Sequence, residues 1–113
     1  MTKEEQEIVQ LISIAGESKA KAFEALKCVK TKEFDLAKGL IEESRNLDLE
    51  AHNIQTDLIS RELSDEVESS NVGLLMVHAQ DHYMTSQLAR DLIETLISVL
   101  QNVDFGITIK TYF

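Results

Sequence analysis

The feature that most constrains this chain is its lack of proline: none of its 113 residues is a proline, and only four are glycine. Folds rich in β-structure need many tight turns, and turns draw mainly on glycine and proline. Proline also breaks helices, so its absence leaves long helices uninterrupted. The composition therefore predicts an all-α fold, and a chain of this length suffices for one domain with a single core.

Apolar residues recur at spacings of three and four along three segments, which is the period of an amphipathic helix. The predicted helices span residues 2–30, 31–62 and about 72–100. Thr2 and Glu5 have the spacing of a capping box at the start of the first helix. Helices this long are typical of a bundle or a coiled coil.

The third predicted helix differs from the other two because apolar residues cover much of its circumference. Residues 64–70 before it are polar and are predicted to form a turn, with Ser69, Ser70 or Asn71 as the N-cap. A helix that is apolar on more than one face must bury more than one face. The extra face predicts self-association through this helix.

Charge and cysteine content narrow the possible environments of the chain. The net charge of −9 disfavours binding to nucleic acid or to anionic membranes, both of which attract basic patches. No apolar run approaches the roughly 20 residues that cross a bilayer, and the N-terminus lacks the pattern of a signal peptide. Cys28, the single cysteine, suits a reducing compartment and is interpreted as a small, partly buried apolar residue. We therefore expect a cytoplasmic protein.

One group of residues in the third helix could carry chemistry. His78 precedes Asp81 by three positions and His82 by four, so the three side chains share one helical face. This face continues as a mainly apolar stripe through Leu74, Thr85, Leu88 and Leu92.

The spacing of the two histidines permits three interpretations. They can be ordinary surface or hydrogen-bonded histidines without chemistry. They can bind zinc together with Asp81, although the glutamate that follows the first histidine in zinc proteases is absent. Finally, one neutral imidazole can attack a phosphoryl group while a nearby carboxylate stabilises the charged product. The pattern alone does not choose among these.

The remaining candidates favour structural roles. His52 is interpreted as a surface or inter-helix histidine, and Met76 and Met84 as packing residues. Residues 102–113 are rich in β-branched and aromatic side chains, which favour extended structure, and have no assigned role.

The sequence resembles a known family. Residues 74–85, LLMVHAQDHYMT, closely resemble a signature that reads approximately LLLVHAQDHLMT in the lactose/cellobiose family of enzyme IIA proteins. These proteins belong to the bacterial phosphoenolpyruvate-dependent sugar phosphotransferase system. Residues 15–26 resemble the first-helix block of that family, and residues 51–59 resemble its AHxIQTxLI block. The likeness extends over about residues 5–100.

The resemblance implies an antiparallel three-helix bundle, up-down-up, over residues 1–101 that assembles as a homotrimer. It also implies that His78 accepts a phosphoryl group from the phosphocarrier HPr and passes it to a cysteine of a IIB component. IIB then phosphorylates a β-disaccharide of the lactose, cellobiose or chitobiose type during transport by the membrane component IIC. The tail, residues 102–113, has no counterpart in the family.

The resemblance also implies roles for the neighbours of His78. Asp81 matches an aspartate at the trimer axis, where three copies can bind a divalent cation, usually Mg²⁺. Gln80 and His82 match supporting positions near the active histidine. The chain departs from the family at Glu17, Ala20 and residues 31–33, all away from His78 in the sequence. The alternative is a non-catalytic helical interaction or regulatory bundle with a silent histidine.

Overall fold

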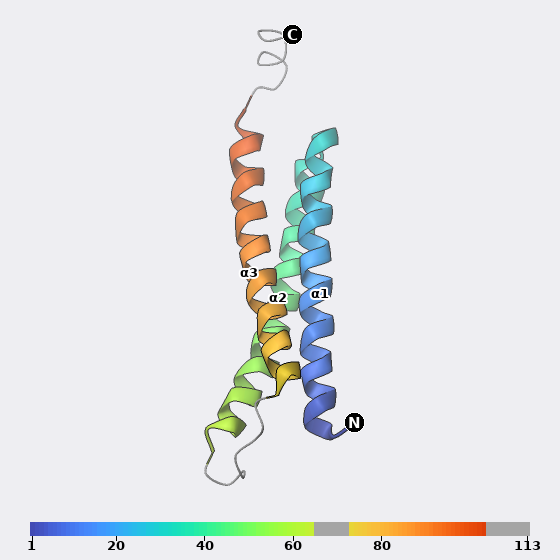
Figure 1. Cartoon of the computed structure of the whole chain (residues 1–113). Coiled ribbons are helices and arrows are strands. Elements are labelled where there is room, and N and C mark those ends of the chain that lie inside the picture. The colour runs from blue at the N-terminus through green and yellow to red at the C-terminus, as the bar shows by residue number, and fades with distance from the viewer. Residues whose placement is uncertain (65–72, 104–113) are drawn as a thin grey trace.

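The structure is a computed structural model that describes residues 1–64 and 73–103. Within these residues, every regular element is helical: α1 (Lys3–Cys28), the short 3₁₀ helix η1 (Val29–Thr31), α2 (Phe34–Glu62) and α3 (Leu74–Gln101). The three long helices lie side by side in an up-down-up arrangement (Figure 1). The predicted all-α, antiparallel three-helix fold is confirmed.

The start of α1 is the predicted capping box. The hydroxyl oxygen of Thr2 accepts a hydrogen bond from the backbone N–H of Glu5, and the carboxylate of Glu5 accepts one from the backbone N–H of Thr2, both at 3.1 Å. The hydrogen bond from the Thr2 backbone N–H favours the ionised carboxylate and lowers the pKa of Glu5. Two orphan donors of the helix terminus are thereby satisfied.

The connection between α1 and α2 differs from the prediction. The first α-helix ends at Cys28, two residues before its predicted end at residue 30, and Val29–Thr31 form η1 in place of that end and of the predicted start of the second helix. Lys32 follows with φ 59°, a left-handed conformation that interrupts the helical path. Consequently α2 begins at Phe34, three residues later than predicted, and ends at Glu62 as predicted.

The N-cap residue of α3 is Gly73, which supplies no side chain for capping. The predicted caps, Ser69, Ser70 and Asn71, lie outside the described residues. The helix ends at Gln101, one residue beyond the predicted end.

The core consists of two clusters stacked along the bundle. The first lies at the end that holds the starts of α1 and α3, and it includes Leu11, Leu58 and Tyr83. The second lies at the opposite end and includes Leu40, Ile93 and Ile97, with Cys28 packed against it as the sequence predicted. Between them, Ser18 and Ser44 hydrogen-bond across α1 and α2, each hydroxyl donating to the other residue's carbonyl at 2.9 Å. These small side chains let the two helices approach closely.

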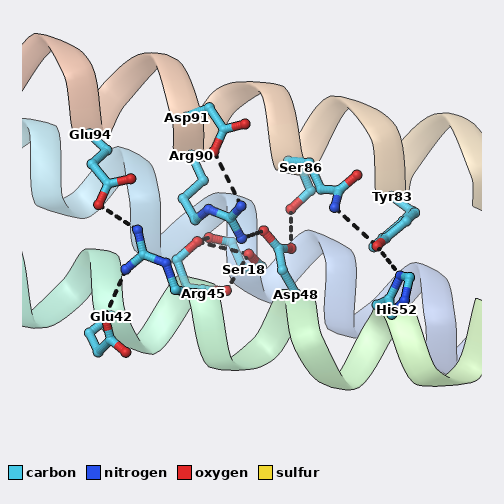
Figure 2. A network of polar contacts seen from close by, with 12 residues as sticks. Ser18, Glu42, Arg45, Asp48, His52, Tyr83, Ser86, Arg90, Asp91 and Glu94 are labelled. Atoms are coloured by element: carbon cyan, nitrogen blue, oxygen red, sulfur yellow. Dashed lines mark hydrogen bonds and ion pairs between the residues drawn. The ribbon is translucent and has the colours of Figure 1, made fainter.

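Charged and polar side chains join α2 to α3 (Figure 2). Arg90 forms an ion pair with Asp48, whose side chain is only 3% exposed, and the hydroxyl of Ser86 donates to the same carboxylate at 3.1 Å. Farther along, Arg45 pairs with Glu42 and Glu94. Because a buried carboxylate requires a partner, these contacts fix how α2 and α3 face each other.

Among the described residues, no helix covers the opposite face of α3. It exposes a row of large apolar side chains: Leu74, Val77, Met84, Leu88, Leu92, Leu96 and Val99. Met84 is 62% exposed, so the prediction that it is a packing residue is wrong within one chain, whereas Met76 does pack against the core. No helix among the described residues is long and apolar enough to cross a membrane.

Candidate functional site

The two histidines of the third helix lie together near its N-terminal end. The rings of His78 and His82 meet edge to face, with their centroids 4.5 Å apart and their planes at 79°. His78 is exposed, whereas His82 is partly buried. The Nδ1 atom of His82 is buried and has no hydrogen-bond partner among the described residues. One imidazole is therefore accessible, and a second touches it with an unused polar atom.

Asp81 is exposed on the same stretch of α3. The hydroxyl of Thr85 can donate a hydrogen bond to either of two backbone carbonyls. The carbonyl oxygen of Asp81 lies 2.8 Å away and that of His82 lies 3.2 Å away. The same hydroxyl oxygen accepts a hydrogen bond from Lys19 Nζ of α1 at 3.1 Å. A cation from another helix is thus held one turn beyond Asp81. Sequence reasoning missed this contact, although Lys19 interrupts the apolar stripe of its helix.

Gln80 lies on a different side of α3. Two helical positions correspond to about 200°, so Gln80 points away from His78. Its Oε1 atom accepts a hydrogen bond from Gln55 Nε2 of α2 at 2.8 Å. Within one chain, the structure therefore brings His78 and His82 together and directs Gln80 toward α2.

His52 is an inter-helix histidine, one of the two roles that the sequence predicted for it. Its Nδ1 atom lies 3.1 Å from the hydroxyl of Tyr83, which also accepts a hydrogen bond from Gln87 Nε2 at 3.0 Å (Figure 2). Tyr83 is buried, and burial raises the pKa of its hydroxyl, with a further contribution from the charge of Asp48.

Two hollows flank the site. One, with a volume of about 450 Å³, is lined mainly by apolar side chains together with His78 and Asp81. The other, of about 300 Å³, lies between the ends of the helices and is lined in part by Val77, Gln80 and Asp81. Because Val77 and Asp81 line both, the hollows adjoin. Neither is an enclosed nucleotide pocket, so the imidazole of His78 can be approached by a macromolecular surface.

A metal centre within one chain is not supported by this geometry. Among the residues that the structure describes, no three His, Cys, Asp or Glu side chains converge as a metal-binding group. In particular, His78, Asp81 and His82 do not form the zinc site that their spacing permits.

Comparison with known proteins identifies relatives over most of the chain. Residues 6–101 match the family described as "PTS system, Lactose/Cellobiose specific IIA subunit". The N,N'-diacetylchitobiose-specific EIIA component of Escherichia coli K12 is 41% identical over 95 residues, which cover 84% of this chain and 80% of the relative. The lactose-specific EIIA component of Staphylococcus epidermidis is 35% identical over 101 residues, covering 88% and 95%.

A solved structure has the same architecture. The solution structure of the IIA(Chitobiose)-HPr complex from the chitobiose branch of the Escherichia coli phosphotransferase system contains a chain that aligns with a TM-score of 0.77. The two sequences are 37% identical, and the alignment covers 89% of this chain and 96% of the other.

Proposed function

The chain belongs to the lactose/cellobiose-specific IIA family of the phosphotransferase system, and on this premise we propose that it carries a phosphoryl group on His78. The single observation that carries this proposal is the exposed imidazole of His78 in contact with the ring of His82, within the segment that resembles the family signature. An accessible neutral imidazole is a competent phosphoryl acceptor.

The proposed reaction consists of two phosphoryl transfers. A ring nitrogen of His78 attacks the phosphorus of a phosphohistidine on the donor protein, so that one N–P bond forms while another breaks. The phosphoryl group then passes to a cysteine thiolate of a IIB component, forming an S–P bond and releasing the imidazole. Such transfers require mainly positioning and charge neutralisation, and an exposed site can provide both once a partner protein covers it.

His82 has the geometry of a supporting residue. Its ring contacts that of His78, and its buried Nδ1 lacks a partner among the described residues. A phosphoryl group on His78 brings acceptor oxygens to this edge of α3. A hydrogen bond from His82 to one of them would be charge-assisted, which makes it stronger than a neutral one. Gln80 remains a supporting candidate only if it comes from another copy, because it points away from His78 in its own chain.

The proposed partners follow from the relatives. The structural relative was solved in complex with HPr, so HPr is the proposed donor. The acceptor is proposed to be a cytoplasmic IIB component, which acts with the membrane component IIC in uptake of a β-disaccharide. The relatives include chitobiose- and lactose-specific proteins, and we propose a sugar of that class.

We also propose that the chain assembles as a homotrimer through α3. The row of exposed apolar side chains on this helix supports the proposal, since burying it removes apolar surface from water. In such a trimer, three Asp81 carboxylates would converge, and Mg²⁺ would offset their repulsion. One chain alone does not fit the ion, because its described residues supply no cluster of three ligands. We assign no step of the transfer to the metal.

Intact-mass spectrometry tests the carrier function. The chain is incubated with phosphoenolpyruvate, enzyme I and HPr at neutral to alkaline pH, because phosphohistidine is labile to acid. We expect the mass of one phosphoryl group to be gained, to disappear on acidification, and to be absent in His78→Ala. Phosphorylation that persists in His78→Ala, or an unmodified chain that never gains the group, would contradict the proposal. Circular dichroism of the variant verifies that its helices are intact.

A further inference from the structure

One end of the bundle carries a group of exposed lysines. At this end α1 and α3 finish and α2 begins, opposite to the N-terminus of the chain (Figure 1). The group consists of four residues in a short stretch of sequence: Lys27, Lys30, Lys32 and Lys38. None of them forms an ion pair with another described residue. We call this group the basic end.

Helix termini explain only part of the basic end. Cations stabilise the C-terminal end of a helix, so Lys27 in the last turn of α1 and Lys30 in η1 have a structural reason to be there. Lys32 and Lys38 lie just before α2 and just after its first turn, where a cation gains nothing from the helix dipole. The basic end therefore holds more positive charge than the helices require.

The basic end has the opposite sign to the rest of the chain. Residues 27–38 contain four lysines and two acidic residues, which give a net charge of +2, whereas all other residues together carry −11. The two acidic residues, Glu33 and Asp35, lie at the start of α2, where the positive end of the helix dipole offsets part of their charge.

The two signs of charge are separated by a distance that salt screens. Interactions between exposed charges fade over about 8 Å at physiological ionic strength, whereas the 26 residues of α1 span about 39 Å. The net charge of −9, which disfavours anionic partners for the chain as a whole, therefore does not describe what a partner meets at the basic end.

The kind of charge and its surroundings favour a lipid surface over an acidic protein or a nucleic acid. All four cations are lysines, which act as compact point charges, whereas arginine provides the fixed two-pronged geometry that recognises single carboxylates and phosphates. Clusters of about four to eight basic residues on amphipathic helices are typical of segments that bind anionic lipids. Leu36 lies among these lysines in the sequence and is 54% exposed, so an apolar side chain accompanies the charges.

The sequence that follows α3 adds apolar residues at the same end. The helix finishes at Gln101, and residues 104–113 include five large apolar or aromatic residues: Phe105, Ile107, Ile109, Tyr112 and Phe113. Tyrosine is enriched at the interface between membrane and water. Stable attachment to a membrane usually needs an apolar contribution in addition to a basic patch. The composition of this segment therefore also favours a lipid surface.

The basic end stays accessible in the proposed trimer. Its lysines belong to α1, η1, α2 and the residue between them, whereas the trimer would bury the apolar row of α3. Rotation about a three-fold axis along α3 places three basic ends on one face of the assembly. His78 and Gln101 are separated by 23 helical positions, about 35 Å, so a surface bound at the basic end leaves the imidazole clear.

We propose that the basic end binds the anionic surface of a membrane. The lysines are attracted to the headgroup phosphates, and Leu36 and the apolar residues of 104–113 add contacts that salt does not screen. The binding itself does not depend on the proposed carrier function, but it extends that function. A carrier held at the membrane stays close to the transport component toward which its phosphoryl group is directed.

Co-sedimentation with phospholipid vesicles tests the proposal. We expect the unmodified chain to sediment with vesicles of phosphatidylcholine and phosphatidylglycerol, to remain in solution with pure phosphatidylcholine, and to be released as salt is raised. Lys30→Gln/Lys38→Gln should lower the partition coefficient by at least about tenfold, because each lysine near an anionic surface adds to the attraction. Tyr112→Ser/Phe113→Ser should lower it at low and high salt alike, since an apolar contact is not screened.

Lys3→Glu is the matched control. Lys3 is exposed at the other end of α1, and this substitution changes the net charge by the same two units as Lys30→Gln/Lys38→Gln. Its partition coefficient should equal that of the unmodified chain. Equal losses in the control and in the double variant would show that the net charge decides, and would overturn the proposal. Equal binding to neutral and anionic vesicles, or binding to neither, would overturn it as well.

Two further measurements separate this proposal from others. A fall in mass by light scattering in Lys30→Gln/Lys38→Gln, without vesicles, would overturn it by showing that an acidic surface of a second copy occupies the basic end. Phosphorylation by phospho-HPr in solution should be unchanged in the same variant, whose helices are verified by circular dichroism. Because vesicle binding needs no phosphoryl transfer, failure of the carrier function and failure of membrane binding are distinct results.

Discussion

The imidazole of His82 meets that of His78 edge to face, with ring centroids 4.5 Å apart, one helical turn along α3. The outer ring is exposed and the inner ring is partly buried. The pair therefore combines one imidazole that a partner can reach with a second imidazole that is partly buried. This division follows from the position of α3, because one side of the helix packs on α1 and α2 while the other faces water.

The first prediction concerns His82. His82→Ala removes the donor proposed for the phosphoryl oxygens, and we expect phosphorylation of His78 to slow by roughly tenfold to a hundredfold, since a hydrogen bond to a charged group contributes about 1.5–3 kcal/mol. Quench-flow measurement with phospho-HPr gives the rate. His82→Gln retains a hydrogen-bond donor and should recover part of the lost phosphorylation rate. An unchanged rate in His82→Ala would remove the supporting role.

The second prediction concerns Asp81. In the proposed trimer, Asp81→Leu exchanges a charged cluster for apolar contact, so the trimer should stay intact or tighten while cation binding is lost. Light scattering measures the mass, and equilibrium dialysis with Mg²⁺ measures binding. Thr95→Leu, on an exposed position of the same helix, serves as the control. A monomeric mass for the unmodified chain would contradict the trimer itself.

The third prediction concerns the ion pair between α2 and α3. Arg90→Met leaves the buried Asp48 carboxylate without its cation, and we expect a loss of about 3–5 kcal/mol in the free energy of unfolding. The double variant Asp48→Leu/Arg90→Met should recover most of that loss, because neither charge then remains buried. Urea denaturation measures both. Arg45→Met serves as the exposed comparison, because the Arg45 side chain is 40% exposed where it pairs with Glu42 and Glu94. Its loss should lower the free energy of unfolding by less than about 1 kcal/mol. Equal losses for Arg90→Met and Arg45→Met would show that burial does not decide the effect.

The fourth prediction is a pH dependence. Burial raises the pKa of Tyr83 in the folded state, so folding favours the neutral hydroxyl. The contribution to stability is fully present below the ordinary tyrosine pKa of about 10 and is lost as the pH rises toward the raised value. Urea midpoints of the unmodified chain should fall more steeply above about pH 10 than those of Tyr83→Phe. Parallel curves for the two proteins would refute this reading.

The helical fold and the set of residues that share a face with His78 could be predicted from the sequence for local reasons. Apolar spacing depends only on neighbours within a turn or two, and so does the capping box of Thr2 and Glu5, which the structure confirms. The shared face of His78, Asp81 and His82 follows from helical geometry alone. The predicted start of the second helix is wrong because Lys32 adopts a left-handed conformation. Glycine and asparagine usually occupy that conformation, and a lysine gives no sign of it in the sequence.

Other features depend on contacts between helices and could not be predicted locally. Lys19 meets Thr85 across 66 positions of the chain, and Gln55 meets Gln80 across 25. Which residues meet depends on the packing register of the helices, and similar side chains occur at neighbouring positions in each turn.

By itself, then, the sequence determined the helical period, the family resemblance and the residues that share the face of His78, because each is written in spacings along one segment. Only the tertiary structure decided that the Nδ1 atom of His82 is buried without a hydrogen-bond partner among the described residues, that Gln80 points to α2, and that residues from three helix ends line a hollow that adjoins the one beside His78. These features arise where segments that are distant in the sequence meet. The segments meet because apolar side chains from all three helices are buried in common clusters.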